Sequence, residues 1–412
     1  MDAQQMLQAL RAGAERELRE NILPYWVQHS VDREQGGFWG RIDGANRIDR
    51  RADKGVVLNT RILWTFAEVW REFGDEGCKA LADRAYEYVV ERFWDPRHGG
   101  VYWMLDYTGR PVSPRKQVYA QAFAIYALVN YHLATGDSDA LAKAWELFEI
   151  LELKARDPLS EGYFEAFGPD WSALEDVRLS PRDLNEKKSM NTHLHLLEAY
   201  ALLLEVTLDP RVQQRLLKLV ELFLDHILDR RSGHLRLFFD EEWNVRSGVV
   251  SFGHDIEAAW LLGEAAGVLQ SSRVVAEVQD ATELLARAVL AEGVADDGGV
   301  VYERREDGTV DTDRHWWPQA EAVVGFLEAF RVTGDSVFLE AAARTWRYVE
   351  KYLVDREHGE WHWAVDAGGR AKAGEDKVGP WKGPYHNTRA CLEIMRRAET
   401  LQSRTGGERS SV

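Results

Sequence analysis

Residues 36–47 read GGFWGRIDGANR, and this pattern decides the fold because it recurs five more times along the chain. The other copies are GGVYWMLDYTGR (99–110), EGYFEAFGPDW (161–171), SGHLRLFFDEEWN (232–244), GGVVYERREDGT (298–309) and HGEWHWAVDAGGR (358–370). In each copy a glycine precedes aromatic or β-branched residues, and turn pairs such as Asp43-Gly44 and Asp307-Gly308 indicate short β-hairpins. Consecutive copies lie 60 to 71 residues apart, measured between Gly37, Gly100, Gly162, Gly233, Gly299 and Gly359. Each repeat therefore has room for two helices.

The segments between the hairpins have the pattern of helix pairs. Examples are 55–73 with 76–93, separated at Gly74-Asp75, and 116–134 with 140–155, separated at Gly136-Asp137. Six such pairs can close on themselves as an inner and an outer ring, without the terminal caps of an open solenoid. We therefore predict an all-α fold, an (α/α)6 barrel with short β-hairpins on one rim, formed by residues 1–412 as a single domain. The charged stretch 169–188 interrupts the third repeat, and we expect it to form a rim loop or lid.

Composition restricts the partners and the compartment. The 51 basic and 68 acidic residues give a net charge of −17, which disfavours binding to nucleic acids or anionic lipid surfaces. The two cysteines, Cys78 and Cys391, fit neither a disulfide framework nor a zinc or redox motif. The sequence has neither a signal-peptide pattern nor an apolar run long enough to span a membrane. These features predict a cytoplasmic protein without nucleic-acid or membrane partners. We also expect a monomer or weak oligomer, although none of these features determines the oligomeric state.

Polar and aromatic residues gather where each predicted inner helix begins. The openings read VVLNTRIL (from residue 56), QVYAQAFAIY (117), MNTHLHLLEAY (190), SFGHDIEAAW (251), RHWWPQAEAV (314) and WKGPYHNTRACLEI (381). If these helices form the inner ring, their first turns share one mouth, where His195, His254 and His386 meet Arg61. Helical spacing places Asn191 on the same face as His195, and Glu257 on the same face as His254. His193 lies two residues from His195 and should point elsewhere.

The residue types at this mouth predict a sugar site. Indoles such as Trp317 and Trp381 can stack on the apolar faces of sugar rings, while amides and carboxylates bind the hydroxyls. The sequence contains no HExxH motif, no carboxylate-rich loop, no GxGxxG motif and no P-loop. We therefore expect neither a metal nor a cofactor.

Four long segments carry a family resemblance. SMNTHLHLLEAY (189–200), SFGHDIEAAWLL (251–262), DRHWWPQAEAVVGF (313–326) and VGPWKGPYHNTRACLEI (378–394) closely resemble the cellobiose 2-epimerase branch of the N-acylglucosamine 2-epimerase superfamily. The resemblance covers essentially the whole chain and implies the same (α/α)6 barrel. By motif position it implies that His254 and His386 are the acid/base histidines and that His195 is a third essential histidine. It also implies substrate contacts at Arg61, Tyr119, Asp183, Asn191, Glu257, Glu303, Trp317 and Trp381, with Asp183 in a mobile loop.

The resemblance further implies an activity, the reversible epimerisation at carbon 2 of the reducing-end glucose of β-1,4-linked disaccharides. Cellobiose would become glucosyl-mannose and lactose would become epilactose, through ring opening and a cis-enediolate. Two histidines on opposite faces of the sugar, or one base with rotation of the intermediate, could move the proton. The base must be a neutral histidine. A nearby helix N-terminus disfavours the charged form of the imidazole, whereas a charged Glu257 would favour that form.

Other activities stay open at this stage. A mannose or glucose 2-epimerase and an aldose-ketose isomerase belong to the same superfamily. A glycoside hydrolase could use Glu257 and Glu321 as its two carboxylates. A non-catalytic sugar-binding module is a further alternative, although binding alone does not require three clustered histidines.

Overall fold

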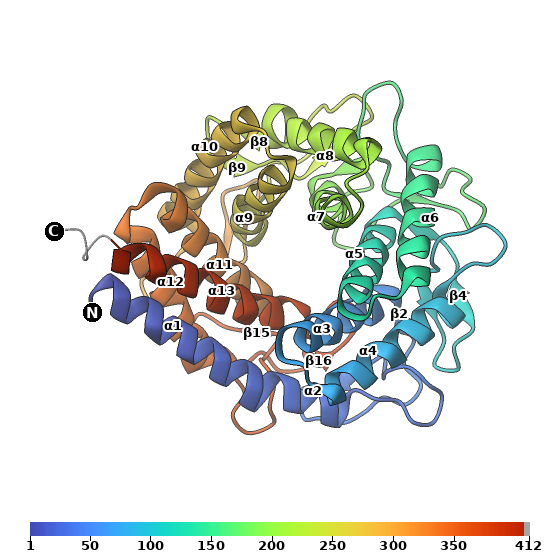
Figure 1. Ribbon diagram of the computed structural model, residues 1–412, viewed down its shortest axis with the longest axis horizontal. Helices are drawn as coiled ribbons and strands as arrows, with labels where there is room; N and C mark the ends of the chain where they lie inside the picture. The colour runs from blue at the N-terminus through green and yellow to red at the C-terminus, as the bar shows by residue number, and fades with distance from the viewer. Residues whose placement is uncertain (408–412) are drawn as a thin grey trace.

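A computed structural model describes residues 1–407, and its helices form two concentric rings around one axis (Figure 1). The inner ring contains α3 (Val56–Phe73), α5 (Val118–Thr135), α7 (Met190–Thr207), α9 (Phe252–Leu269), α11 (Trp316–Thr333) and α13 (Tyr385–Gly407). The outer ring contains α4 (Glu76–Tyr88), α6 (Ser138–Lys154), α8 (Pro210–Leu222), α10 (Ser272–Ala288) and α12 (Ser336–Tyr348), together with α1 (Ala3–Glu17) and α2 (Leu23–His29). The predicted (α/α)6 barrel is confirmed.

Short π-helical segments extend several outer helices. They span Val89–Phe93, Phe223–Ile227, Val289–Gly293 and Val349–Leu353, and a fifth, Leu18–Ile22, joins α1 to α2. Each inner helix packs against the next one, and α13 returns to pack against α3. Helix α1 covers α13 and α12, so the first and last described helices lie side by side (Figure 1). The ring is thus closed by contacts between the two ends of the chain.

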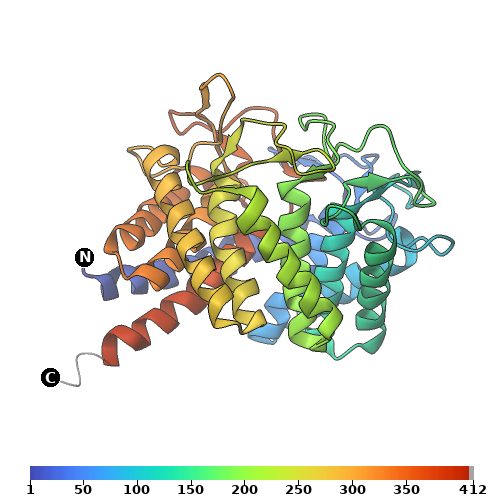
Figure 2. The same ribbon diagram turned by 90° about the horizontal axis from the view of Figure 1, so that it is seen from above.

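The strands all lie at one end of the barrel (Figure 2). They are β1 (Ile42–Asp43), β2 (Lys54–Gly55), β3 (Met104–Leu105), β4 (Pro111–Ser113), β5 (Lys116–Gln117), β6 (Ala166–Phe167), β7 (Lys188–Ser189), β8 (Leu228–Asp229), β9 (His234–Leu235), β10 (Phe238–Phe239), β11 (Val250–Ser251), β12 (Glu303–Arg304), β13 (Val310–Asp311), β14 (Arg314–His315), β15 (Ala364–Val365) and β16 (Asp376–Val378). The hairpins are therefore on one rim, as predicted.

The strand pairing goes beyond the isolated hairpins that the sequence suggests. The strand before each inner helix pairs with a strand from the next hairpin: β2 with β3, β5 with β6, β7 with β10, β11 with β12 and β14 with β15. The last of these strands, β16, pairs with β1 of the first hairpin. The six hairpins thus form a second closed ring, which fixes the openings of the inner helices relative to one another.

Buried ion pairs attach this rim to the barrel. Lys54, Lys116 and Lys188 each stand two residues before an inner helix, and each bonds an aspartate that lies just before the hairpin of its own repeat. The Nζ–Oδ2 distances are 2.7 Å to Asp32, 2.8 Å to Asp95 and 2.8 Å to Asp157. Lys377 makes the equivalent pair with Asp355 at 2.7 Å. Since removing one member would leave an unpaired buried charge, these pairs favour a single rim geometry.

Three of the five turns from an inner helix to the next outer helix follow one design. Gly74, Gly136 and Gly334 end α3, α5 and α11 in the left-handed conformation, with φ of 68°, 76° and 71°. The aspartate that follows each glycine caps the next helix through its side chain, as Asp75 does for the backbone N–H of Cys78. Both features are frequent signals at helix ends, so the sequence alone locates these three turns.

Leu208 departs from this design, and we predict that Leu208→Gly stabilises the fold by about 1 kcal/mol. Leu208 ends α7 with φ of 52°, and its side chain is 78% exposed, so the strained backbone has no compensating burial. Chemical denaturation should show a higher midpoint for the variant. Leu153→Gly is the matched control, because Leu153 is 77% exposed in the last turn of α6, where glycine should lower the stability by up to about 1 kcal/mol. Equal destabilisation in both variants would contradict the prediction.

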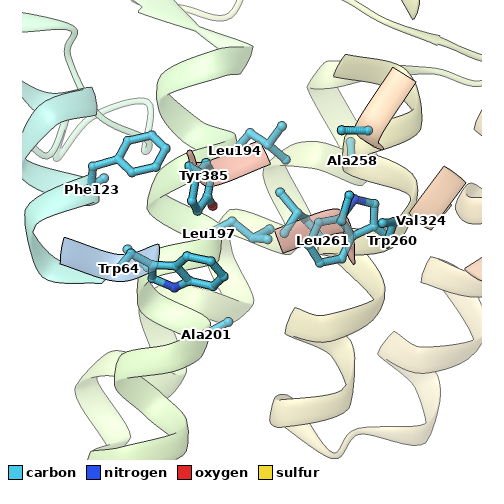
Figure 3. Packing of buried hydrophobic residues seen from close by; sticks show 14 of the residues in the cluster. Trp64, Phe123, Leu194, Leu197, Ala201, Ala258, Trp260, Leu261, Val324 and Tyr385 are labelled. Atoms are coloured by element: carbon cyan, nitrogen blue, oxygen red, sulfur yellow. The ribbon is translucent and has the colours of Figure 1, made fainter. Parts of the chain in front are cut away.

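Large side chains from the inner helices fill the barrel below the rim (Figure 3). Tyr385 lies between Trp64 and Phe123, with ring centroids 5.0 Å and 5.4 Å away, both in edge-to-face geometry. Leu197 and Trp260 approach from α7 and α9 (Figure 3). The barrel is therefore packed at this level; the larger cavities lie at the rim end, and a smaller one of about 150 Å³ lies at the opposite end.

The charged stretch 169–188 lies at the rim, and its residues 179–183 line the mouth of the barrel. The predicted rim loop is in place. Within residues 1–407, no helix has the length and apolar character that crossing a bilayer requires.

Candidate active site

The side chains at the mouth come from equivalent positions of the inner helices. The second residue supplies Tyr119 on α5, Asn191 on α7, Trp317 on α11 and His386 on α13, whereas the sixth residue supplies Arg61 on α3, His195 on α7 and Glu257 on α9. Residues four apart in a helix share one face, so both positions point at the barrel axis. His254 is the third residue of α9 and joins them.

These side chains line a cavity of about 400 Å³. Its walls include ten of the eleven residues that the sequence singled out: Arg61, Tyr119, Asp183, Asn191, His195, His254, Glu257, Trp317, Trp381 and His386. Glu303 lines an adjoining cavity of about 780 Å³ instead. Asp183, Asn191 and His254 border both spaces, so the two cavities form one continuous cleft under the rim loop.

His386 is a neutral histidine held by a carboxylate. Its Nδ1 lies 2.7 Å from Oε1 of Glu321 and donates to it. Burial lowers the pKa of His386 to about 3, because desolvation outweighs the favourable bond to Glu321. Since Nδ1 is engaged, Nε2 is the nitrogen that a bound sugar can reach.

His254 is also neutral but has a different partner. Its Nδ1 is 2.7 Å from the Ser251 hydroxyl, and burial lowers its pKa to about 3. The expected opposition from Glu257 is wrong, because Glu257 bonds Arg389 and its own pKa is raised by burial and by the neighbouring Glu321. The rings of His254 and His386 both contact Trp317, at centroid distances of 4.7 Å and 5.8 Å.

A glycine permits the contact between His254 and Trp317. Gly253 directly precedes His254, and a Cβ built on it would lie 2.5 Å from the Trp317 indole. That distance is shorter than carbon atoms can approach, so a side chain at this position would displace the indole from His254.

His195 and Arg61 complete the polar wall. Nδ1 of His195 donates to Oε2 of Glu198 at 2.9 Å, and burial lowers the pKa of His195. Arg61 donates through Nη2 to the Tyr119 hydroxyl and through Nη1 to the carbonyl of Trp381, both at 2.9 Å. Its Nε has no partner among the described residues. The guanidinium is therefore fixed in place with donor capacity left for a ligand.

His193 lies outside the cavity, as its spacing predicts. Its Nε2 accepts from the backbone N–H of Tyr163 at 2.9 Å, and its Nδ1 donates to the carbonyl of Ser189 at 2.7 Å. Gln121 and Gln319 stand at the same fourth position of α5 and α11, and they bond the backbones of Val101 and Val300 in their own hairpins. The fourth position therefore holds hairpins and does not contribute to the site.

One residue of the site was not predicted from the sequence, the arginine that links the carboxylate partners of two histidines. Arg389, 2% exposed on α13, donates through Nη2 to Glu257 Oε1 at 2.7 Å and to Glu321 Oε1 at 2.8 Å. Its Nη1 donates to Oε1 of Glu198. We call Arg389 and these three glutamates the arginine cluster. The one signal in the sequence for a role of Arg389 in the site is its position three residues after His386, which places both side chains on the same face of the helix.

The arginine cluster engages the carboxylates that a metal site or a glycoside hydrolase would use. Glu257, Glu321 and His386 each have one possible metal-ligand atom, and these three atoms lie within 4.8 Å of one another, but the Arg389 guanidinium already bonds both carboxylates. A hydrolase needs carboxylates on both sides of the scissile bond. Here one nitrogen holds Glu257 and Glu321 together, and Glu321 is not among the described residues lining either cavity. The pair therefore does not have the geometry of a glycosidase.

The pKa values predict a pH dependence. A histidine base with a pKa of about 3 stays neutral at pH 5, so protonation of the base should lower kcat/KM by less than about twofold between pH 7 and pH 5. A base with the ordinary pKa of 6.5 would lose about 30-fold over this range. The unfolded chain takes up protons below pH 6.5 that the buried neutral histidines do not, so the fold loses stability as the pH falls. Unfolding measured at each pH is the control.

The fold and the cavity define a class, a carbohydrate-converting enzyme of the (α/α)6-barrel type, and the comparisons identify its family. The N-acylglucosamine 2-epimerase family model matches residues 37–390. A cellobiose 2-epimerase of Bacteroides fragilis is 46% identical over 391 residues, which cover 95% of this chain and 100% of that protein. The chain belongs to the N-acylglucosamine 2-epimerase family, and it is a carbohydrate epimerase, an isomerase.

Two solved structures agree with this assignment. The cellobiose 2-epimerase of Spirochaeta thermophila is 41% identical with a TM-score of 0.89, covering 96% of this chain and 98% of that chain. The enzyme of Bacillus thermoamylovorans is 37% identical with a TM-score of 0.90, covering 95% and 100%. The similarity therefore extends over the barrel and its rim.

Proposed function

We propose that this chain is a cellobiose 2-epimerase. It would interconvert glucose and mannose at the reducing end of β-1,4-linked disaccharides, turning cellobiose into glucosyl-mannose and lactose into epilactose. The observation that carries the proposal is the pair of neutral histidines, His254 and His386, which border one cavity with Arg61. The names of the relatives described above support the choice of substrate.

The proposed reaction moves one proton at carbon 2. Opening of the reducing-end ring gives an aldehyde, whose carbonyl acidifies the proton on carbon 2. One of the two histidines takes this proton through Nε2, and the electron pair passes to the carbonyl to give a cis-enediolate. The other histidine, which is neutral in the free enzyme and must first take up a proton from solvent, delivers that proton to the opposite face of carbon 2 as the carbonyl forms again, and solvent then restores both histidines. A single base with rotation of the intermediate is the alternative.

Arg61 would stabilise the enediolate, and His195, whose Nδ1 is bonded to Glu198, would accept a hydrogen bond from a sugar hydroxyl through Nε2. The negative charge develops on the oxygens of carbons 1 and 2, so fixed donors aimed at them lower the barrier. The Arg61 guanidinium is held by Tyr119 and by the carbonyl of Trp381 before any sugar binds. Asn191, on the same face as His195, would add a weaker contact.

The remaining residues would hold the disaccharide. Trp317 and Trp381 offer indole faces for stacking on the sugar rings. Asp183 and Glu303, which border the outer part of the cleft, would accept hydrogen bonds from the hydroxyls of the second sugar. Glu257 lines the inner cavity and would contact the reducing-end sugar.

The proposal extends to the domain organisation, the oligomeric state and the location of the enzyme. We propose that residues 1–412 form one catalytic domain, a monomer or weak oligomer in the cytoplasm, with no cofactor and no nucleic-acid or membrane partner. Two buried free thiols, Cys78 and Cys391, and the net charge of −17 support this setting.

Product analysis with cellobiose, lactose and mannose side by side tests the proposed function. Glucosyl-mannose and epilactose without released monosaccharide are the expected products. Release of glucose from cellobiose would indicate a hydrolase. Accumulation of glucosyl-fructose would show that the proton returns to carbon 1, as in an aldose-ketose isomerase. Faster turnover of mannose than of cellobiose would reassign the enzyme to monosaccharides.

A further inference from the structure

The arginine cluster connects two of the histidines that border the cavity. Glu198 accepts from Nδ1 of His195, and Glu321 accepts from Nδ1 of His386. Arg389 bonds both carboxylates, so one guanidinium lies behind two histidines on different helices. His254 is outside this arrangement, because its Nδ1 faces the Ser251 hydroxyl.

We propose that Arg389 is a positioning residue that sets the tautomer of both His195 and His386. It does so by keeping Glu198 and Glu321 ionised, so that each accepts the Nδ1 proton of its histidine and leaves Nε2 unprotonated toward the cavity. This proposal rests on the proposed function, in which Nε2 of a neutral histidine acts on the substrate. Partners of this kind commonly fix ring orientation and tautomer in enzyme sites.

The charge balance of the cluster supports the proposal. Three buried carboxylates face one guanidinium, and burial disfavours every negative charge in this space. Burial opposes the charge of Glu321, yet Arg389 and His386 together lower its pKa. Burial and the neighbouring Glu321 raise the pKa of Glu257, whereas the pKa values of Glu198 and Glu321 are lowered, so Glu257 is the member of the cluster that takes up a proton most readily.

Loss of the guanidinium would move protons within the cluster. A protonated Glu321 would donate to Nδ1 of His386 and force the proton onto Nε2, which removes the base. Other titratable groups also face the cluster, namely Arg61 on α3, Tyr119 and Tyr126 on α5, Tyr385 on α13 and His254 on α9. Arg61 adds positive charge, but it is directed at Tyr119 and Trp381 and bonds none of the three carboxylates.

The test compares Arg389→Lys with Arg397→Lys. Arg397 lies two turns further along α13, is 10% exposed and also bonds three carboxylates, Glu264, Glu328 and Glu393. Lysine keeps the charge but cannot reproduce the fork that reaches three partners. For Arg389→Lys we expect kcat to fall about 10–100-fold with KM within about threefold, and the acid limb of kcat to move up by at least about one pH unit. Arg397→Lys should keep the wild-type pH profile.

Every outcome of this comparison either supports the proposal or overturns it. A folded Arg389→Lys with a lower kcat and an unchanged pH profile would reduce Arg389 to a packing residue and overturn it. If that variant does not fold, ¹⁵N chemical shifts of His386 in Glu321→Leu, which leaves Nδ1 without its carboxylate acceptor, report the tautomer directly. We expect a protonated Nε2 there, and a retained wild-type tautomer would overturn the link. This readout needs no turnover, so it separates failure of this proposal from failure of the proposed function, which the wild-type product analysis decides.

Discussion

Replacing His386 with alanine is expected to lower kcat for epimerisation by about 10²–10⁴-fold, the usual contribution of a positioned acid or base. The substituted side chain is buried against Glu321 and Trp317, so its loss removes the Nε2 that faces the cavity while the helix pairs remain packed. His254→Ala should cause a loss of the same size. Initial rates of glucosyl-mannose formation from cellobiose are the measurement, with circular dichroism as the control for folding.

The two variants also separate the two possible mechanisms. If each histidine serves one face of carbon 2, each variant should still exchange the carbon 2 proton of one epimer with deuterated water without inverting it. His386→Ala and His254→Ala should then prefer opposite epimers, one cellobiose and the other glucosyl-mannose. If one base acts alone, its loss abolishes exchange from both epimers. Substantial epimerisation by either variant would contradict the assignment of that histidine.

Arg61→Lys is expected to lower kcat/KM by about 10²–10³-fold, comparable with the loss of one oxyanion donor. A lysine retains the charge but cannot bond Tyr119, the Trp381 carbonyl and the enediolate together, because it lacks the planar fork. Arg71→Lys on the same helix is the matched control, since Arg71 is 38% exposed and bonds Glu68 outside the cavity. Steady-state kinetics with cellobiose should leave this control within about twofold of wild type. An Arg61→Lys variant with wild-type kcat/KM would remove Arg61 from the proposed mechanism.

The repeats made the fold predictable from the sequence, because each turn carries a local signal. A glycine with positive φ followed by a capping aspartate marks the turn at Gly74 and at Gly334, and helical spacing separates His193 from His195. The pairing of β16 with β1 could not be predicted, because it joins residues more than 300 positions apart and no local pattern encodes it. Ring closure therefore became visible only in three dimensions.

The residues that line the cavity could be predicted from the sequence, whereas the buried arginine cluster behind them could not. Residues at the second and sixth helix positions repeat around the ring, so the wall could be assembled from spacing. Arg389 could not be assigned, because an arginine on a helix usually faces solvent, and only burial reveals its three partners. The same cluster explains why Glu257 does not raise the pKa of His254, since its carboxylate is committed to Arg389.

The central claim is that the cavity moves a proton at carbon 2, and conversion of cellobiose in deuterated water tests it most directly. The product should be glucosyl-mannose with deuterium at carbon 2 of the reducing-end sugar, formed without release of glucose, and proton NMR should show the loss of the carbon 2 signal. Glucosyl-mannose that carries deuterium only at other carbons, or cellobiose that is cleaved to glucose, would contradict the account.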